Sequence, residues 1–83
     1  MDTDKPDGTI EYDGYQIEYY EIGNRIHLDS NQFDAFMSDS TDYVPPARDL
    51  FLKLDARSAI SVARSNGKED FADFLIRKFP DKV

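Results

Sequence analysis

The sequence predicts an α+β fold, in which a three-stranded antiparallel β-meander (about 9–28) is packed on one face by three to four short helices. Three observations lead to this prediction. Two hairpin signals, Asp13-Gly14 and Gly23-Asn24, separate segments in which apolar and polar residues alternate. Beyond residue 28 the apolar residues recur every three or four positions, which is typical of helices. Finally, 83 residues without cysteine make one domain that burial must stabilise, largely through its six Phe and five Tyr side chains.

The two turns define the strand register. Asp13-Gly14 suits a type I′ turn, in which both central residues have positive φ, and Gly23-Asn24 suits type II′, which prefers Gly first. The predicted pairs are Tyr12 with Tyr15, Ile10 with Ile17, Ile22 with Arg25, Tyr20 with His27, and Tyr19 with Leu28. The two registers agree on one apolar face, which consists of Ile10, Tyr12, Tyr15, Ile17, Tyr19, Ile26 and Leu28.

The opposite face of the meander is mostly polar. It carries Glu11, Gln16, Glu18, Tyr20, Ile22, Arg25 and His27. Tyr20, Ile22 and His27 are bulky for a surface that faces only water, so we expect either a second element or a partner protein to cover them.

The first helix is expected over about residues 30–38. Asp29 can cap its start, and Gln32 follows at capping-box spacing. Leu28 and Phe33 are placed for a hydrophobic staple, while Phe33 and Phe36 begin one buried stripe. Aromatic residues at this spacing are typical of a core rather than of a cofactor site.

A second helix is predicted over about 46–54, because Pro46 suits a first helical turn. A strand stays an alternative, since leucines alternate with other residues from Leu50 to Leu54. The apolar stripe changes side after Leu54, so we place a break at Asp55, which can cap a helix over about 56–65. One long helix over 46–65 is the other alternative.

The last helix is predicted over about 68–79. Gly67 can supply a left-handed residue after the preceding helix, and Asn66 and Glu69 have capping spacing. Pro80 marks the end of this helix. Residues 1–8 are expected to form a disordered tail, because they are polar and contain Pro6 and Gly8, and residues 9–83 form the single domain.

Charge divides the chain into two halves. Residues 1–44 contain two basic and eleven acidic side chains, a net charge of −9. Residues 45–83 contain eight basic and six acidic side chains, a net charge of +2, so the whole chain carries −7. Such an asymmetry can steer association with a basic partner, although solubility and attraction between the two halves explain it as well.

No motif for catalysis, metal binding or cofactor binding is present. His27 is the only histidine, and it lies mid-strand without the companions of a nucleophilic triad. Seventeen carboxylates always offer some close pair, so their number indicates no particular acid–base site. Asp29 to Asn31 and Asp39 to Asp42 are oxygen-rich but do not follow the calcium-loop pattern, and no phosphate loop exists. We therefore predict no enzyme, no cofactor and no metal site.

One segment has the layout of a helix-turn-helix. Residues 55–79 predict helix, glycine turn and helix, and a DNA-binding transcriptional regulator that uses them is the alternative function. The second helix begins Lys68-Glu69-Asp70, which would bring carboxylates towards phosphates. The charge therefore disfavours direct nucleic-acid binding.

The favoured function is a small acidic non-catalytic protein-binding module, an inhibitor or regulator that engages a basic surface of a partner protein, with a nucleic-acid-binding surface as one candidate. In size and charge the chain resembles small phage-encoded inhibitors, including anti-CRISPR proteins and DNA mimics. Its polar start is no signal peptide and no apolar run could span a membrane, so a cytoplasmic protein is expected. The sequence leaves open whether the chain forms a homodimer. The expected partner-binding residues are Glu11, Glu18, Tyr20, Glu21, His27, Asp34, Asp39 and Asp42.

Overall fold

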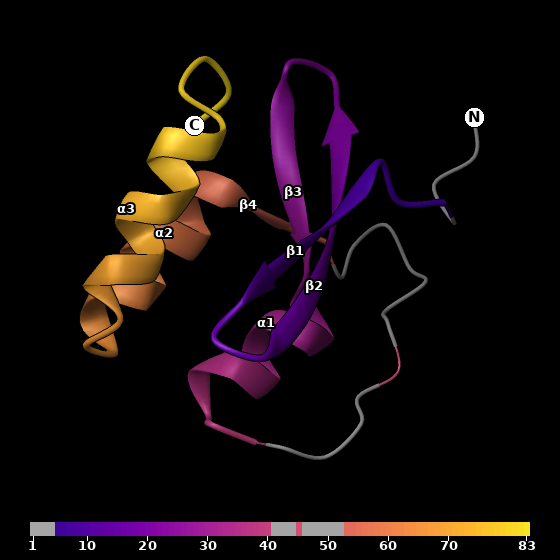
Figure 1. Ribbon diagram of the computed structural model, residues 1–83. Coiled ribbons are helices and arrows are strands. Elements are labelled where there is room, and N and C mark those ends of the chain that lie inside the picture. Colours follow the sequence, from indigo (N-terminus) through magenta and orange to yellow (C-terminus); the bar gives the residue numbers. More distant parts are fainter. Residues whose placement is uncertain (1–4, 41–44, 46–52) are drawn as a thin grey trace.

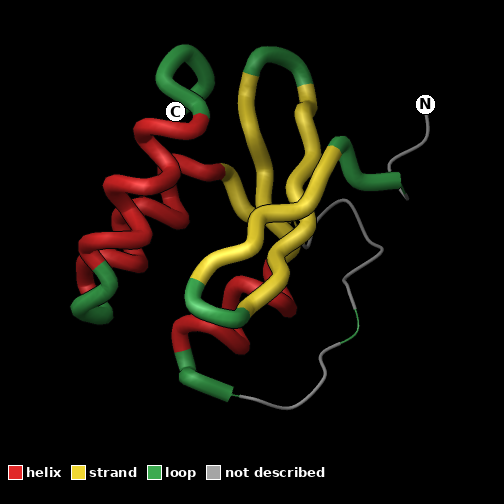
Figure 2. Tube along the Cα trace, viewed as in Figure 1, coloured by secondary structure: helices red, strands yellow, loops and turns green. Residues whose placement is uncertain are grey.

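A computed structural model describes residues 5–40, 45 and 53–83 of the chain. It contains a four-stranded antiparallel sheet in the order β1-β2-β3-β4 and three helices (Figure 1; Figure 2). The elements are β1 Gly8–Tyr12, β2 Tyr15–Ile22, β3 Arg25–Asp29, α1 Ser30–Met37, β4 Lys53–Asp55, α2 Ala56–Ser65 and α3 Glu69–Lys78. The α+β class is confirmed, and a short fourth strand adds to the predicted meander.

Both hairpins have the predicted register. All five predicted pairs are present, from Ile10 with Ile17 in the first hairpin to Tyr19 with Leu28 in the second. Asp13 and Gly14 both have positive φ (52° and 83°), as a type I′ turn requires. In the second turn Gly23 has a φ of 65° and Asn24 has no positive φ, as type II′ requires.

The apolar core lies between one face of the sheet and the three helices. Figure 1 shows α2 and α3 beside each other at one side of the sheet, with α1 beneath it. Phe71 of α3 is fully buried, and its ring centroid lies 4.8 Å from that of Phe36 and 5.2 Å from that of Tyr12. Aromatic edges and faces therefore join α1, α3 and the first hairpin. The buried members of the core are Ile10, Ile17, Ile26, Leu28, Phe33, Phe36, Ala56, Ala59, Ile60, Ala63, Phe71, Ala72 and Leu75.

Asp29 caps α1 as predicted, because its Oδ1 accepts a hydrogen bond from the Gln32 amide at 3.0 Å. Gln32 does not complete a capping box. Its Oε1 instead accepts from the backbone N–H of Glu18 at 2.7 Å. The next rung of the β2–β3 ladder would join Glu18 to Asp29, where the chain turns into α1, so the Gln32 amide takes the place of the missing strand residue.

At the other end of β2, a side chain again takes the place of a strand residue as hydrogen-bond acceptor. Asp7 Oδ2 accepts a hydrogen bond from the Glu21 N–H at 2.6 Å, beyond the start of β1. The Asp7 N–H donates to the Tyr19 carbonyl at 2.9 Å. Gly8 belongs to β1 and Asp7 is hydrogen-bonded to β2, although both residues were predicted to lie in the disordered tail.

The helix predicted over 46–54 is wrong at its end. Lys53–Asp55 is a strand, and Leu54 pairs with Leu28 of β3, which agrees with the alternative of a strand. Residues 46–52 lie outside the described residues. The break at Asp55 is confirmed, because its Oδ1 accepts from the Arg57 amide at 2.8 Å and caps α2.

The α2–α3 connection is a Schellman turn. Lys68 N donates to the Ala63 carbonyl at 2.8 Å and Gly67 N donates to the Arg64 carbonyl at 3.2 Å, with Gly67 at a φ of 76°. The predicted capping role of Asn66 towards the last helix is wrong. Asn66 ends α2, its Nδ2 donates to the Val62 carbonyl, and α3 begins after Lys68 without a side-chain cap.

Candidate functional site

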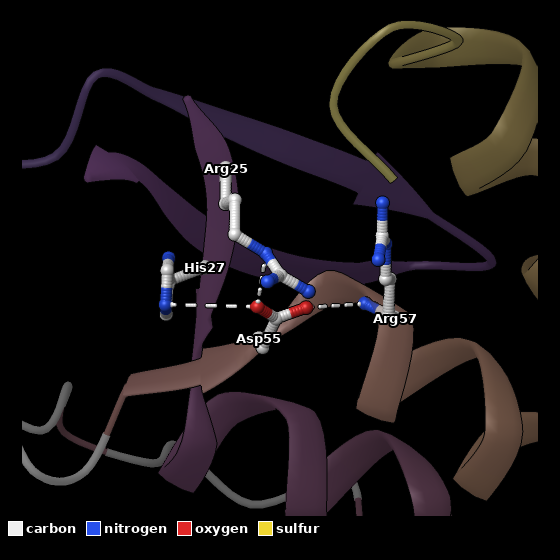
Figure 3. A network of polar contacts seen from close by, with 4 residues as sticks. All are labelled: Arg25, His27, Asp55 and Arg57. Atoms are coloured by element: carbon white, nitrogen blue, oxygen red, sulfur yellow. Dashed lines mark hydrogen bonds and ion pairs between the residues drawn. The ribbon is translucent and has the colours of Figure 1, made fainter. Parts of the chain in front are cut away.

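A polar network centred on Asp55 lies where β3, β4 and α2 meet (Figure 3). Arg25 and His27 point towards it from β3, and Arg57 donates its backbone amide from the first turn of α2. Arg25 Nε lies 2.8 Å from Asp55 Oδ2, whereas His27 Nε2 lies 4.0 Å from the same oxygen. Asp55 therefore holds a strand end, a helix start and one cation together, and His27 is not hydrogen-bonded to it.

Tyr20 lies on the same face of the sheet as this network, but it is only 2% exposed. The Nζ of Lys53 stands 4.5 Å from the centre of its ring, a cation–π contact. Lys53 is itself 8% exposed, and its register partner Asp29 is fully buried. The expectation that Tyr20 projects from an open sheet face is thus wrong, because Tyr20, Lys53 and Asp29 are all buried on this part of the face.

Glu18 and His27 flank Tyr20 and are partly buried. The Glu18 Oε1 and His27 Nδ1 atoms are both shielded from solvent, and neither has a hydrogen-bond partner among the described residues. The side chain of His27 is 20% exposed. Both residues are partly buried, and their role in binding a partner stays a prediction.

Glu21 and Asp39 form ion pairs within the chain. The Asp39 carboxylate lies 2.8 Å from Lys68 Nζ, and the Glu21 carboxylate contacts Lys82 Nζ. Lys68 directly precedes α3 and Lys82 follows it, so one pair at each end ties this helix to the acidic part of the fold. Glu21 also faces the helical side of the sheet, opposite Ile26. These two predicted contact residues therefore contribute to attraction between the two halves of the chain.

Among residues 5–40, four exposed carboxylates take part in no ion pair between described residues. One precedes β1, two lie in the first hairpin, and the fourth lies on α1. We call Asp7, Glu11, Asp13 and Asp34 the acidic surface. A shallow depression of about 260 Å³ lies beside the hairpin turn, with the Glu11 and Asp13 side chains and two tyrosines among its lining residues. Asp42, the last of the predicted contact residues, lies outside the described residues.

The charge asymmetry of the sequence becomes a spatial one in the fold. Residues 5–40, which form β1 to β3 and α1, carry two basic and eight acidic side chains, a net charge of −6. Residues 53–83, which form β4, α2 and α3, carry seven basic and five acidic side chains, a net charge of +2. The part of the fold that consists of β1 to β3 and α1 is thus acidic, and the part that consists of β4, α2 and α3 is weakly basic.

Several residues of this region could not be assigned from the sequence alone. The Arg25–Asp55 pair depends on β4, which is only three residues long. Lys53 has no local signal for burial, because lysine is almost always exposed. The only sequence hint was the bulk of Tyr20 and His27 on a face that otherwise looked solvated.

Among residues 5–40, 45 and 53–83, no group of three or more His, Asp or Glu side chains is placed to hold a metal ion. Nor is any helix of those residues long and apolar enough to cross a membrane. No protein-family model, curated protein or solved structure matches the chain.

Proposed function

We propose that this protein is a small non-catalytic binding module, an inhibitor or regulator, whose acidic surface engages a basic surface of another protein. The observation that supports it is the set of four exposed carboxylates (Asp7, Glu11, Asp13 and Asp34) that take part in no ion pair between described residues and lie together in the part of the fold with a net charge of −6. Other carboxylates of the same part of the fold are already neutralised by Lys68 and Lys82.

Long-range electrostatics favours this function. One part of the fold with a net charge of −6 beside another of +2 gives the molecule a directed field, which raises the association rate with a basic surface. A partner whose basic groove ordinarily binds nucleic acid offers a suitable density of cations, and the carboxylates would then occupy positions of phosphates. Glu18 is paired with Thr9 on the strand beside β1, and His27 lies one strand further on; we assign both a supporting role.

Direct DNA binding through residues 55–79 is less favoured on electrostatic grounds. Glu69 and Asp70 are exposed in the first turn of α3, where phosphates would approach a recognition helix. If the protein shifted duplex DNA in a sequence-specific way in a low-salt gel-shift assay, DNA binding would become the favoured function.

The test compares two double charge reversals, Glu11→Lys with Asp13→Lys, and Glu69→Lys with Asp70→Lys. Each changes the net charge from −7 to −3, but the first alters the acidic surface and the second alters α3. Tagged protein is incubated with a cell lysate at low and high salt, and the captured proteins are quantified by mass spectrometry. We expect basic proteins to be captured by the wild type and the α3 variant, to be lost with the hairpin variant, and to be released by salt. Equal capture by all three proteins would contradict the proposal.

A further inference from the structure

We propose that the free edge of β1 is a docking edge, to which an extended basic segment of a partner protein adds as an antiparallel strand. This inference rests on the proposed function and names the form that the partner takes at the acidic surface. It follows from the direction of the β1 backbone groups, from the charges that flank them, and from the charge of the chain itself.

The backbone groups of Thr9 and Glu11 point away from the sheet. In a two-residue hairpin the residues next to the turn form a hydrogen-bonded pair, here Tyr12 with Tyr15. Hydrogen-bonded and open pairs then alternate, so Ile10 bonds to Ile17 while Thr9 and Glu11 direct their N–H and C=O groups outward. A contact of β2 supports this alternation, because the Glu18 N–H points away from β1 and donates to Gln32 Oε1.

β1 is an edge strand of the described sheet, and no described strand lies beyond it. Edge strands offer unpaired N–H and C=O groups as a template for another strand. Thr9 and Glu11 are both exposed. The second edge, β4, is three residues long and leads directly into α2, so it offers little room for a further strand.

The acidic side chains along β1 favour a basic segment as the added strand. Asp7 lies before its start and Asp13 after its end, while Glu11 projects from the strand itself. Glu18 lies on the neighbouring strand, paired with Thr9. A lysine opposite Glu11 on an added strand would face opposite charge at cross-strand distance. Side chains opposite Ile10 and Tyr12 would lie on the core side, where apolar residues are favoured.

A second copy of this chain is a poor occupant of the edge. Antiparallel pairing of two β1 strands would bring the carboxylates of both copies together, and each copy carries a net charge of −7. Like charges placed opposite each other destabilise a strand pair. The same carboxylates that repel a second copy attract a strand in which lysine or arginine alternates with apolar residues.

The test uses a synthetic peptide, Lys-Val-Lys-Val-Lys-Val-Lys, and the ¹⁵N-labelled wild-type protein. In antiparallel addition with lysine opposite Glu11, the lysine N–H groups point towards β1 and the valine N–H groups point away. We expect the peptide to shift the Thr9 and Glu11 amide resonances most and to slow their exchange with solvent. N-methylation of the lysine amides should weaken binding about tenfold or more, whereas N-methylation of the valine amides should leave it within about twofold. Equal effects of the two methylation patterns would overturn strand addition.

A second arm separates this inference from the proposed function. If the hairpin variant Glu11→Lys with Asp13→Lys loses the peptide while both methylated peptides bind the wild type equally, the acidic surface stands and strand addition is wrong. If the hairpin variant binds the peptide as the wild type does, both are wrong. Thr9→Pro removes one outward N–H and should weaken binding, while its matched control Thr9→Val keeps that group and should not. The expected pattern for both proposals is loss in the hairpin variant, in Thr9→Pro and with the methyl-lysine peptide only.

Discussion

The ring of Tyr19 lies over the backbone of Gly8, its register partner in the first hairpin. A Cβ atom added to Gly8 would lie 2.4 Å from the Tyr19 hydroxyl oxygen and 2.6 Å from Cζ. The same ring packs against Phe79, at a centroid distance of 5.0 Å and an interplanar angle of 64°. An aromatic side chain that covers a glycine of an edge strand is a known means of holding register. Here it also connects the start of β1 to the end of α3.

Gly8→Ala should therefore destabilise the fold by about 1–3 kcal/mol, the usual cost of overfilling a packed position. Urea unfolding measures this change. In a Tyr19→Ala background the same substitution should cost much less, because the clashing ring is gone. An equal cost in both backgrounds would show that the Tyr19 ring does not cover Gly8.

Gln32→Met should cost about 1–2 kcal/mol, because it removes the acceptor of the half-buried Glu18 N–H while keeping the length of the side chain. Amide exchange at Glu18 should become faster. Gln16→Met is the matched control, since Gln16 donates to Glu11 only on the exposed surface, and it should cost about 0.5 kcal/mol or less. Unchanged exchange at Glu18 would mean that Gln32 does not extend the ladder.

Asp55 has two roles that a pair of substitutions separates. Asp55→Asn keeps an oxygen that can cap α2 and loses only the half-exposed ion pair with Arg25, so it should cost about 0.5 kcal/mol. Asp55→Ala loses the cap as well and should cost about 1–2 kcal/mol in urea unfolding. The account of the α2 start is wrong if the two variants are equally stable.

Tyr20→Ala should behave as a core substitution, with a loss of about 3–5 kcal/mol, as for other large buried aromatic side chains. Ile76→Ala is the comparison, because Ile76 is one of the exposed large apolar residues, and it should cost far less. Thermal and urea unfolding measure both. A nearly neutral Tyr20→Ala would restore Tyr20 as a surface residue.

The local signals for turns and caps were sufficient to predict much of the fold. Asp13-Gly14 and Gly23-Asn24 set both registers, and Asp29 and Asp55 were recognised as helix starts. These features depend on residues that are close in sequence, so the pattern carries the information. β4 was predicted only as an alternative to a helix, because Pro46 favoured a helix and the pairing of β4 with β3 is a long-range contact.

The site was harder to predict, because charge composition does not show which carboxylates are already paired. Glu21 and Asp39 were expected to face a partner, yet Lys82 and Lys68 reach them from opposite ends of α3. Tyr20 was expected on an open face, yet Lys53 makes a cation–π contact with its ring from β4, which was predicted only as an alternative to a helix. Glu11 and Asp34 are exposed as expected, and their role in binding a partner stays a prediction.

Amide hydrogen exchange of the free protein, resolved residue by residue along β1, tests the docking edge most directly. The outward direction of Thr9 and Glu11 predicts fast exchange at these two amides and slow exchange at Ile10 and Tyr12, which bond to β2. Equal protection at all four positions would mean that the edge is already covered, and it would contradict the account.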